Sequence, residues 1–139
     1  MPTKIFVNLP VADLDRSMTF FKALGFTFNP QFTDETAACM VISEDIYSML
    51  LTRKRFKDFT KKEVADATKT TEVLTALSME SRQEVDAILE KALAAGATPA
   101  RDPMDHGFMY ERSFNDLDGH IWEIFYMDMS AAPPPGAAG

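Results

Sequence analysis

The chain has 139 residues, 46% of them hydrophobic, and 14 Lys or Arg stand against 21 Asp or Glu, for a net charge of −7. This length supports one domain with a substantial core and is too short for two independent ones. The acidic balance argues against a nucleic-acid-binding protein, because affinity for phosphates needs a broad basic face. Six cations cluster in residues 53–62, which indicates a solvated linker helix or, alternatively, an anion-attracting lip beside a pocket.

Membrane and secretion signals are not apparent in the sequence. No apolar run is long enough to span a bilayer, and residues 1–6 lack the basic segment and apolar block of a secretory signal. The single Cys39 cannot form an intramolecular disulfide, which is in keeping with a reducing compartment. We therefore expect a cytoplasmic protein that binds neither membranes nor nucleic acid.

The first half of the chain shows one strand, one helix and then three strands. Residues 4–10 alternate as a strand that places Phe6 and Asn8 on one face. Asp13 is the expected N-cap of a helix that Gly25 ends. Turn residues then separate three further strands, at residues 26–32, 36–43 and 46–52.

The second half has the same order of elements. Ser81, with Glu84 three residues later, forms the capping-box pattern of a helix start, and Gly96 ends that helix. Asp118 and Gly119 are the expected turn of the final hairpin. The strands around this helix are expected at residues 72–79, 97–101, 108–114 and 120–127.

The two halves read as copies of one module. The helix ends Ala-Leu-Gly25-Phe-Thr and Ala-Ala-Gly96-Ala-Thr are alike, and their glycines lie 71 residues apart. We expect a single domain over residues 1–129, built from modules 4–52 and 71–128 with a linker at 53–70. The tail, residues 130–139, is expected to be disordered, because it has little to bury.

The pattern predicts an α+β fold of two βαβββ modules. Neither module is large enough to close a core alone, so their mixed sheets are expected to pair edge to edge as a half-barrel, with a helix behind each. The concave face of such a half-barrel is the default place for a ligand.

Two motifs at opposite ends of the chain carry a family resemblance. One is Val-Ala-Asp-Leu-Asp-Arg-Ser-Met-Thr-Phe-Phe at residues 11–21, and the other is Ser-Phe-Asn-Asp-Leu-Asp-Gly-His-Ile-Trp-Glu at residues 113–123. With the module order, they resemble the glyoxalase, bleomycin-resistance and extradiol-dioxygenase superfamily, also called vicinal oxygen chelate proteins. The resemblance covers residues 4–128, and it implies a homodimer.

The resemblance also implies where a divalent metal would bind. The superfamily takes one ligand from the first strand of each module and a carboxylate from the last strand. Glu123 matches that carboxylate, but Phe6 and Leu74 occupy the two first-strand positions, and Met49 lies at the equivalent of Glu123 in the first module. One carboxylate cannot replace the hydration shell of a divalent ion. We therefore expect no metal site and no cofactor.

One arrangement would keep a divalent metal possible. If the fold brought His106 and Glu72 next to Glu123, three donors could hold an ion.

Glu123 is the candidate catalytic residue. On a strand between apolar neighbours, its carboxylate is expected to be partly desolvated, which suits it to proton transfer or to anchoring a ligand. An alternative role is a structural pairing with Arg112 or Tyr110 on the adjacent strand. Strand alternation gives the candidate ligand-binding residues Phe6, Asn8, Met49, Tyr110, Arg112 and Phe125.

Two functions remain open at this point. The first is a metal-free protein that binds a small aromatic or cationic molecule in an apolar cleft, as in the bleomycin-resistance branch. The second is a metal-dependent lyase or dioxygenase, similar to lactoylglutathione lyase or to an extradiol dioxygenase. Whether the protein is an enzyme therefore stays open.

Overall fold

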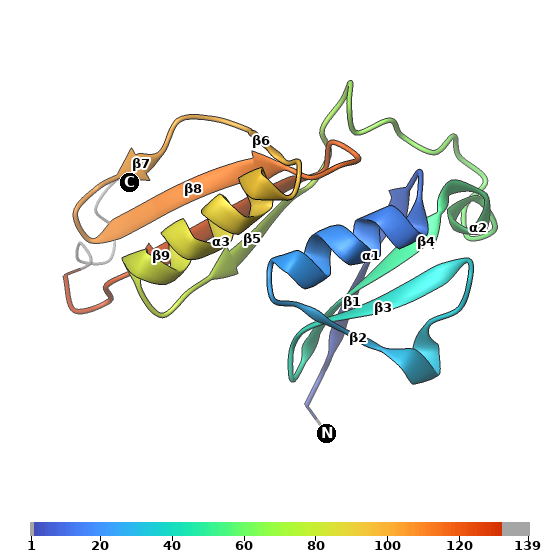
Figure 1. The fold of residues 1–139 in the computed structure, drawn as a ribbon, viewed down its shortest axis with the longest axis horizontal. Helices are drawn as coiled ribbons and strands as arrows, with labels where there is room; N and C mark the ends of the chain where they lie inside the picture. Colours follow the sequence, from blue (N-terminus) through green and yellow to red (C-terminus); the bar gives the residue numbers. More distant parts are fainter. Residues whose placement is uncertain (1, 132–139) are drawn as a thin grey trace. The chain divides into compact units, whose positions relative to one another are not determined.

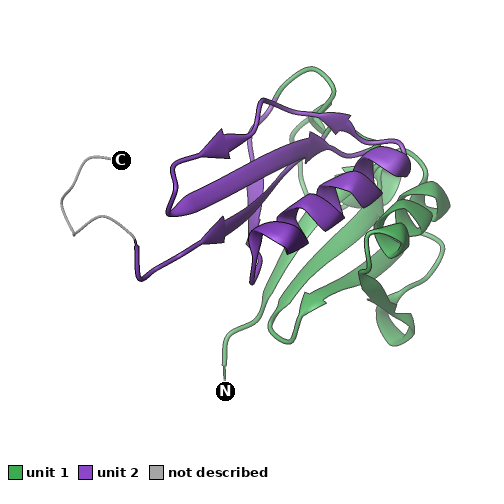
Figure 2. Ribbon diagram, turned by 60° about the vertical axis from the view of Figure 1, so that its left-hand side comes forward, with its two compact units in different colours: residues 1–70, 117–119 green, residues 71–116, 120–139 purple. Residues whose placement is uncertain are grey.

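The computed structural model describes residues 2–131, and most of the tail for which disorder is expected, residues 132–139, lies outside that range. The chain divides into two compact units (Figure 2). Unit 1 comprises residues 1–70 together with 117–119, and unit 2 comprises 71–116 together with the residues from 120 onward. Each unit holds one sheet and one long helix.

Unit 1 contains a four-stranded sheet with the order β1-β4-β3-β2, in which β1 runs parallel to β4 and the other pairs are antiparallel (Figure 1). Helix α1 lies across one face of this sheet. The elements are β1 (Ile5–Val11), α1 (Leu14–Ala23), β2 (Thr27–Asn29), a 3-10 turn (Pro30–Phe32), β3 (Ala37–Ser43), β4 (Ile46–Thr52) and α2 (Arg53–Lys57).

Helix α1 begins and ends where the sequence predicts. The Asp13 side chain accepts a hydrogen bond from the Arg16 backbone N–H at 3.1 Å, so it caps the first turn. Gly25 follows the helix at φ +105°, a conformation that favours glycine. The helix buries an apolar stripe that includes Leu14, Phe20 and Phe21.

The two faces of the unit 1 sheet differ in character. Met40, Ser48 and Leu50 alternate on one face and are fully buried. The opposite face carries Phe6 from β1 and Met49 from β4, and these residues are more accessible.

Unit 2 contains a sheet with the order β5-β9-β8-β6, and β7 also pairs with β8. Strands β5 and β9 are parallel, whereas β8 is antiparallel to β9. Helix α3 covers one face (Figure 1) and buries Val85, Leu89 and Ala92. The elements are β5 (Leu74–Ser78), α3 (Arg82–Ala94), β6 (Thr98–Pro99), β7 (Met104–Asp105), β8 (Met109–Asn115) and β9 (Ile121–Met127).

These elements confirm the α+β class and the two successive βαβββ modules. Three expected strands are clearly shorter than the pattern suggests, and the one expected at 72–79 spans only Leu74–Ser78. The strand expected at 26–32 ends at Asn29, because Pro30 begins a 3-10 turn. The strand expected at 97–101 is reduced to β6, after which the unexpected short strand β7 extends the sheet. Among residues 2–131, no helix is long and apolar enough to cross a bilayer.

Candidate functional site

Glu123 lies on β9, and its partner is an arginine from a loop. Its side chain is 14% exposed, and its Oε2 lies 3.1 Å from Nη2 of Arg101. Arg101 belongs to the loop between β6 and β7. The alternative in which Glu123 pairs with Arg112 or Tyr110 is wrong, because both of these residues pair with Asp86.

A second carboxylate shares the same guanidinium. Nη2 of Arg101 also pairs with Oε1 of Glu111, whose side chain is 11% exposed. In the register of β8 and β9, Glu111 lies opposite Phe125. Residues opposite each other in an antiparallel pair point to the same face, and so do residues two apart on a strand. Glu111, Glu123 and Phe125 therefore share one face of the unit 2 sheet.

Ser113 belongs to the same face, because it lies directly opposite Glu123. It is 3% exposed, and its Oγ has no hydrogen-bond partner within residues 2–131. A buried hydroxyl without a partner is uncommon, since most buried polar groups are hydrogen-bonded. We name the group formed by Arg101, Glu111, Ser113 and Glu123 the carboxylate cluster.

Tyr110 and Arg112 point to the opposite face, toward α3. The Tyr110 hydroxyl donates to Asp86 Oδ1 at 2.6 Å. Nη1 of Arg112 lies 3.0 Å from the same Asp86 oxygen and 3.3 Å from Glu90 Oε1. The structure therefore separates these two predicted ligand residues from Glu123 and Phe125.

The contacts on α3 shift two pKa values. The hydrogen bond from Tyr110, helped by the positive charge of Arg112, lowers the pKa of the Asp86 carboxyl below its ordinary value. Burial, followed by the bond to Asp86, raises the pKa of Tyr110. The shifts favour a neutral Tyr110 hydroxyl donating to an ionised Asp86, and the contacts of Tyr110 and Arg112 with Asp86 and Glu90 hold α3 on the sheet.

The predicted ligand residues of unit 1 lie together on β1 and β4. Phe6 stacks on Tyr47, with ring centroids 4.6 Å apart and an interplanar angle of 9°. Asn8 pairs in register with Met49, and its Nδ2 donates to the Phe6 carbonyl oxygen at 3.1 Å. Phe6 is 48% exposed, so this stack presents apolar surface.

The donor set does not fit the metal that the superfamily resemblance implies. Among residues 2–131, no three side chains of His, Cys, Asp or Glu are grouped closely enough to hold an ion, so His106, Glu72 and Glu123 do not meet. The two carboxylates that do share a face are both paired with Arg101. A divalent ion would have to displace that guanidinium and would then find mainly these two residues as ligands.

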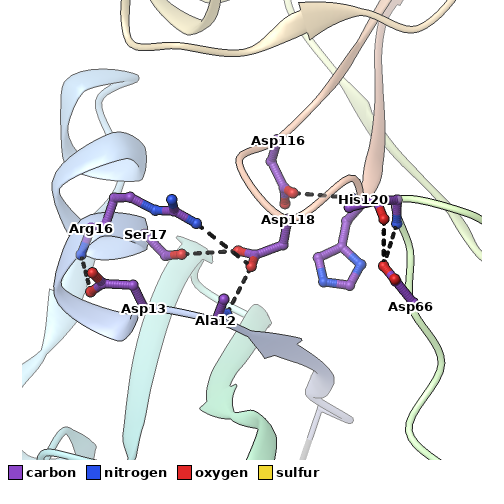
Figure 3. Close-up of polar contacts among 9 residues, drawn as sticks. Ala12, Asp13, Arg16, Ser17, Asp66, Asp116, Asp118 and His120 are labelled. Atoms are coloured by element: carbon purple, nitrogen blue, oxygen red, sulfur yellow. Dashed lines mark hydrogen bonds and ion pairs between the residues drawn. The ribbon is translucent and has the colours of Figure 1, made fainter.

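The Asp-Leu-Asp-Gly-His turn at residues 116–120 has a structural function. In unit 1, Asp118 Oδ1 accepts from the Ala12 N–H at 2.8 Å, and Oδ2 accepts from the Ser17 hydroxyl at 3.2 Å (Figure 3). In unit 2, Asp116 accepts from the His120 N–H at 3.0 Å and from the Trp122 indole N–H at 2.9 Å. The turn therefore holds the backbone just before α1 and the Ser17 side chain of that helix, and it orders the hairpin.

Sequence reasoning missed Arg101 and Glu111. Glu111 has the strand position of a residue on the Glu123 face, but this becomes visible only when the β8–β9 register is known. Arg101 carries no local signal, because it reaches the site from a loop.

Comparisons with known proteins agree with this architecture. Residues 3–43 match the family model described as bleomycin resistance protein-like N-terminal. The hypothetical protein SA1046 from S. aureus is 30% identical, with 91% of this chain and 95% of that chain covered and a TM-score of 0.76. A search of curated proteins gives no significant match.

Two further structures share the fold. A glyoxalase/bleomycin resistance protein/dioxygenase family enzyme from Burkholderia phytofirmans is 16% identical, with coverage of 88% and 96% and a TM-score of 0.72. A glyoxalase/bleomycin resistance protein/dioxygenase from Nocardioides is 22% identical, with coverage of 100% and 91% and a TM-score of 0.72. Fold, N-terminal family match and closing motif agree, and the chain belongs to the glyoxalase, bleomycin-resistance and dioxygenase superfamily.

Proposed function

We propose that this protein binds a small molecule without a divalent metal. The observation that carries the proposal is the guanidinium of Arg101, which pairs with both Glu111 and Glu123. Glu123 stands where the superfamily resemblance implies a metal-ligating carboxylate, and here that carboxylate is paired with an arginine. The match of residues 3–43 to a bleomycin-resistance model supports the binding branch of the superfamily over its enzymes.

The pairing matters because of the chemistry of the donors. A hard divalent ion needs several oxygen ligands to offset the loss of its water shell. Arg101 already donates a charge-assisted hydrogen bond to Glu123 and forms an ion pair with Glu111. An ion would have to break these contacts and gain few others, so Glu123 serves as an anchor for a ligand.

The apolar side chains around the predicted ligand residues support a ligand with an apolar or aromatic part. The stacked pair of Phe6 and Tyr47 offers a flat apolar surface beside Asn8 and Met49. Phe125 lies opposite Glu111 on the face of the carboxylate cluster. We propose these residues as ligand contacts, and we further propose a homodimer that works in the cytoplasm.

The alternative is a metal-dependent lyase or dioxygenase. It is favoured by one observation, namely that Glu123 stands at the position of the superfamily carboxylate. It requires Arg101 to leave the carboxylates so that an ion can enter.

The two functions are separated by one experiment. Protein purified without chelators or an affinity tag is analysed for bound metals, and metal-free bleomycin and a panel of small aromatic molecules are then screened by thermal shift with and without EDTA. We expect substoichiometric metal and a ligand-dependent rise in Tm that EDTA does not change. Stoichiometric Zn²⁺, Ni²⁺, Mn²⁺ or Fe²⁺ that is lost in Glu123→Ala would overturn the proposal.

A further inference from the structure

We propose that the carboxylate cluster recognises a primary ammonium group of the ligand, and that Arg101 is an internal competitor that the ligand displaces. This inference rests on the proposed function and names the ligand class for it. Three observations support it: the excess negative charge of the cluster, the position of Arg101 in a loop, and the buried Ser113 hydroxyl without a partner among the described residues.

The charges of the cluster do not balance. Glu111 and Glu123 are both largely buried, and the one guanidinium paired with them leaves one negative charge in excess. The other paired arginines of unit 2 bind elsewhere, Arg82 to Asp105 and Arg112 on the α3 face. A carboxylate removed from water is stabilised by a cation in contact with it. The cluster therefore favours a cationic ligand over a neutral or anionic one.

Arg101 is the most exchangeable member of the cluster. Its side chain is 40% exposed, whereas those of both carboxylates are mostly buried. It lies in a loop between two strands of only two residues each, and the preceding backbone is held by a long hydrogen bond from Ala100 N to Ser113 O of 3.3 Å. The partly exposed guanidinium can return to water when it withdraws, whereas the buried carboxylates then need another cation in its place.

Ser113 supplies the acceptor that Arg101 leaves unused. Its buried Oγ lies on the cluster face opposite Glu123 and has no partner within the described residues 2–131. An ammonium group has three N–H donors and no acceptor, and one hydroxyl and two carboxylates offer it three acceptor groups. This match selects a primary amine as the ligand group.

The experiment uses benzylamine as the probe, with benzyl alcohol as its neutral counterpart and benzoate as the anion. Binding to the full chain is measured by titration calorimetry for wild type, Arg101→Ala and the matched control Arg55→Ala, which removes an exposed arginine paired with Asp58. We expect Arg101→Ala to bind benzylamine about five- to tenfold more tightly, because the ligand no longer breaks a partly exposed ion pair. Arg55→Ala should bind as wild type does.

The acceptors are tested with conservative variants. Glu111→Gln and Glu123→Gln should abolish benzylamine binding, and Ser113→Ala should weaken it without affecting benzyl alcohol. If Arg101→Ala does not fold, Arg101→Gln keeps the length of the side chain while removing its charge, and a urea midpoint checks that it is folded.

The inference is overturned if removing Arg101 leaves benzylamine affinity unchanged or lower, if benzyl alcohol gains equally, or if benzylamine binds no variant. If the screen finds a ligand that binds without metal and whose affinity is unchanged by Glu111→Gln and Arg101→Ala, this inference alone is refuted. The proposed function would then stand. Benzylamine binding that follows the expected order but requires a bound metal would refute the proposed function instead.

Discussion

Replacing Asp118 with alanine tests the part of the structure that holds the start of α1. The carboxylate accepts hydrogen bonds from the Ala12 N–H at 2.8 Å and from the Ser17 hydroxyl at 3.2 Å, and Ser17 is only 1% exposed. Hydrogen bonds to a charged group contribute about 1.5–3 kcal/mol each, and a buried hydroxyl left unpaired adds a penalty. We therefore expect Asp118→Ala to lower the free energy of unfolding by about 3 kcal/mol. Arg16, 4.0 Å away and half exposed, adds little.

The assay is urea denaturation followed by circular dichroism, with Asp15→Ala as the control. Asp15 is an exposed acid in the first turn of α1, so its removal costs only the interaction with the helix dipole, about 0.3–1 kcal/mol. If Asp118→Ala is no more destabilising than Asp15→Ala, the Asp118 carboxylate acts only through its charge, and the reasoning from its hydrogen bonds is refuted.

Two further predictions concern backbone conformation and pH. Gly119→Ala should lower the free energy of unfolding by more than about 2 kcal/mol, because φ is +88° and a Cβ would lie 2.7 Å from the Ala67 carbonyl oxygen. Gly25→Ala should lower it by only about 1 kcal/mol, because φ is +105° but nothing lies within 4 Å of the added Cβ. Equal urea midpoints for the two variants would contradict this prediction. Tyr110→Phe should lower stability at neutral pH, because the lowered pKa of Asp86 makes that carboxylate stabilising above its ordinary value of 3.8. The difference from wild type should shrink as the pH falls through the lower pKa of the native state, and a difference that stays constant in acid would contradict the assignment.

The helices and turns of this fold are predictable because their signals are local. Ser81 accepts from the Glu84 N–H at 3.1 Å, as its capping-box spacing predicts, while Glu84 reaches back to the Glu80 N–H at 2.8 Å. Gly25 follows its helix with a positive φ, and the sequence shows the glycine that this conformation favours. Such features depend on residues within one turn of each other, so one sequence is enough to find them.

The candidate site was harder to predict because successive residues of a strand point to opposite faces of the sheet. A choice wrong by one residue moves a side chain to the other face of the sheet. Tyr110 and Arg112 follow this rule: they lie next to Glu111 in sequence but bind Asp86 on α3, while Glu111 shares the face of Glu123. The polar character of all three residues gives no indication of which face is covered by a helix.

Arg101 could not be predicted from the sequence, because its role comes from the path of a loop. It lies 22 residues before Glu123 and ten before Glu111, and neither β6 nor β7 is long enough to give a periodic signal. The same loop explains why the sequence could say only in part whether Glu123 is available as a metal ligand. Missing ligands can be counted along the chain, but the pairing of the Arg101 guanidinium with Glu111 and Glu123 is visible only in three dimensions.

An arginine at this position changes what the site can select. A metal ion draws oxygen atoms of a ligand toward itself, because it keeps coordination positions for them. The Arg101 guanidinium has only donors. Nη2 is directed at Glu111 and Glu123 and Nη1 at Met104 Sδ, so a ligand gains most by bringing a cation of its own to the same carboxylates. Within one superfamily fold, this exchange would turn a surface that chelates oxygen through a metal into one that recognises amines. The selectivity for benzylamine over benzoate therefore tests the proposed recognition of amines, and metal analysis tests the proposed absence of a metal separately.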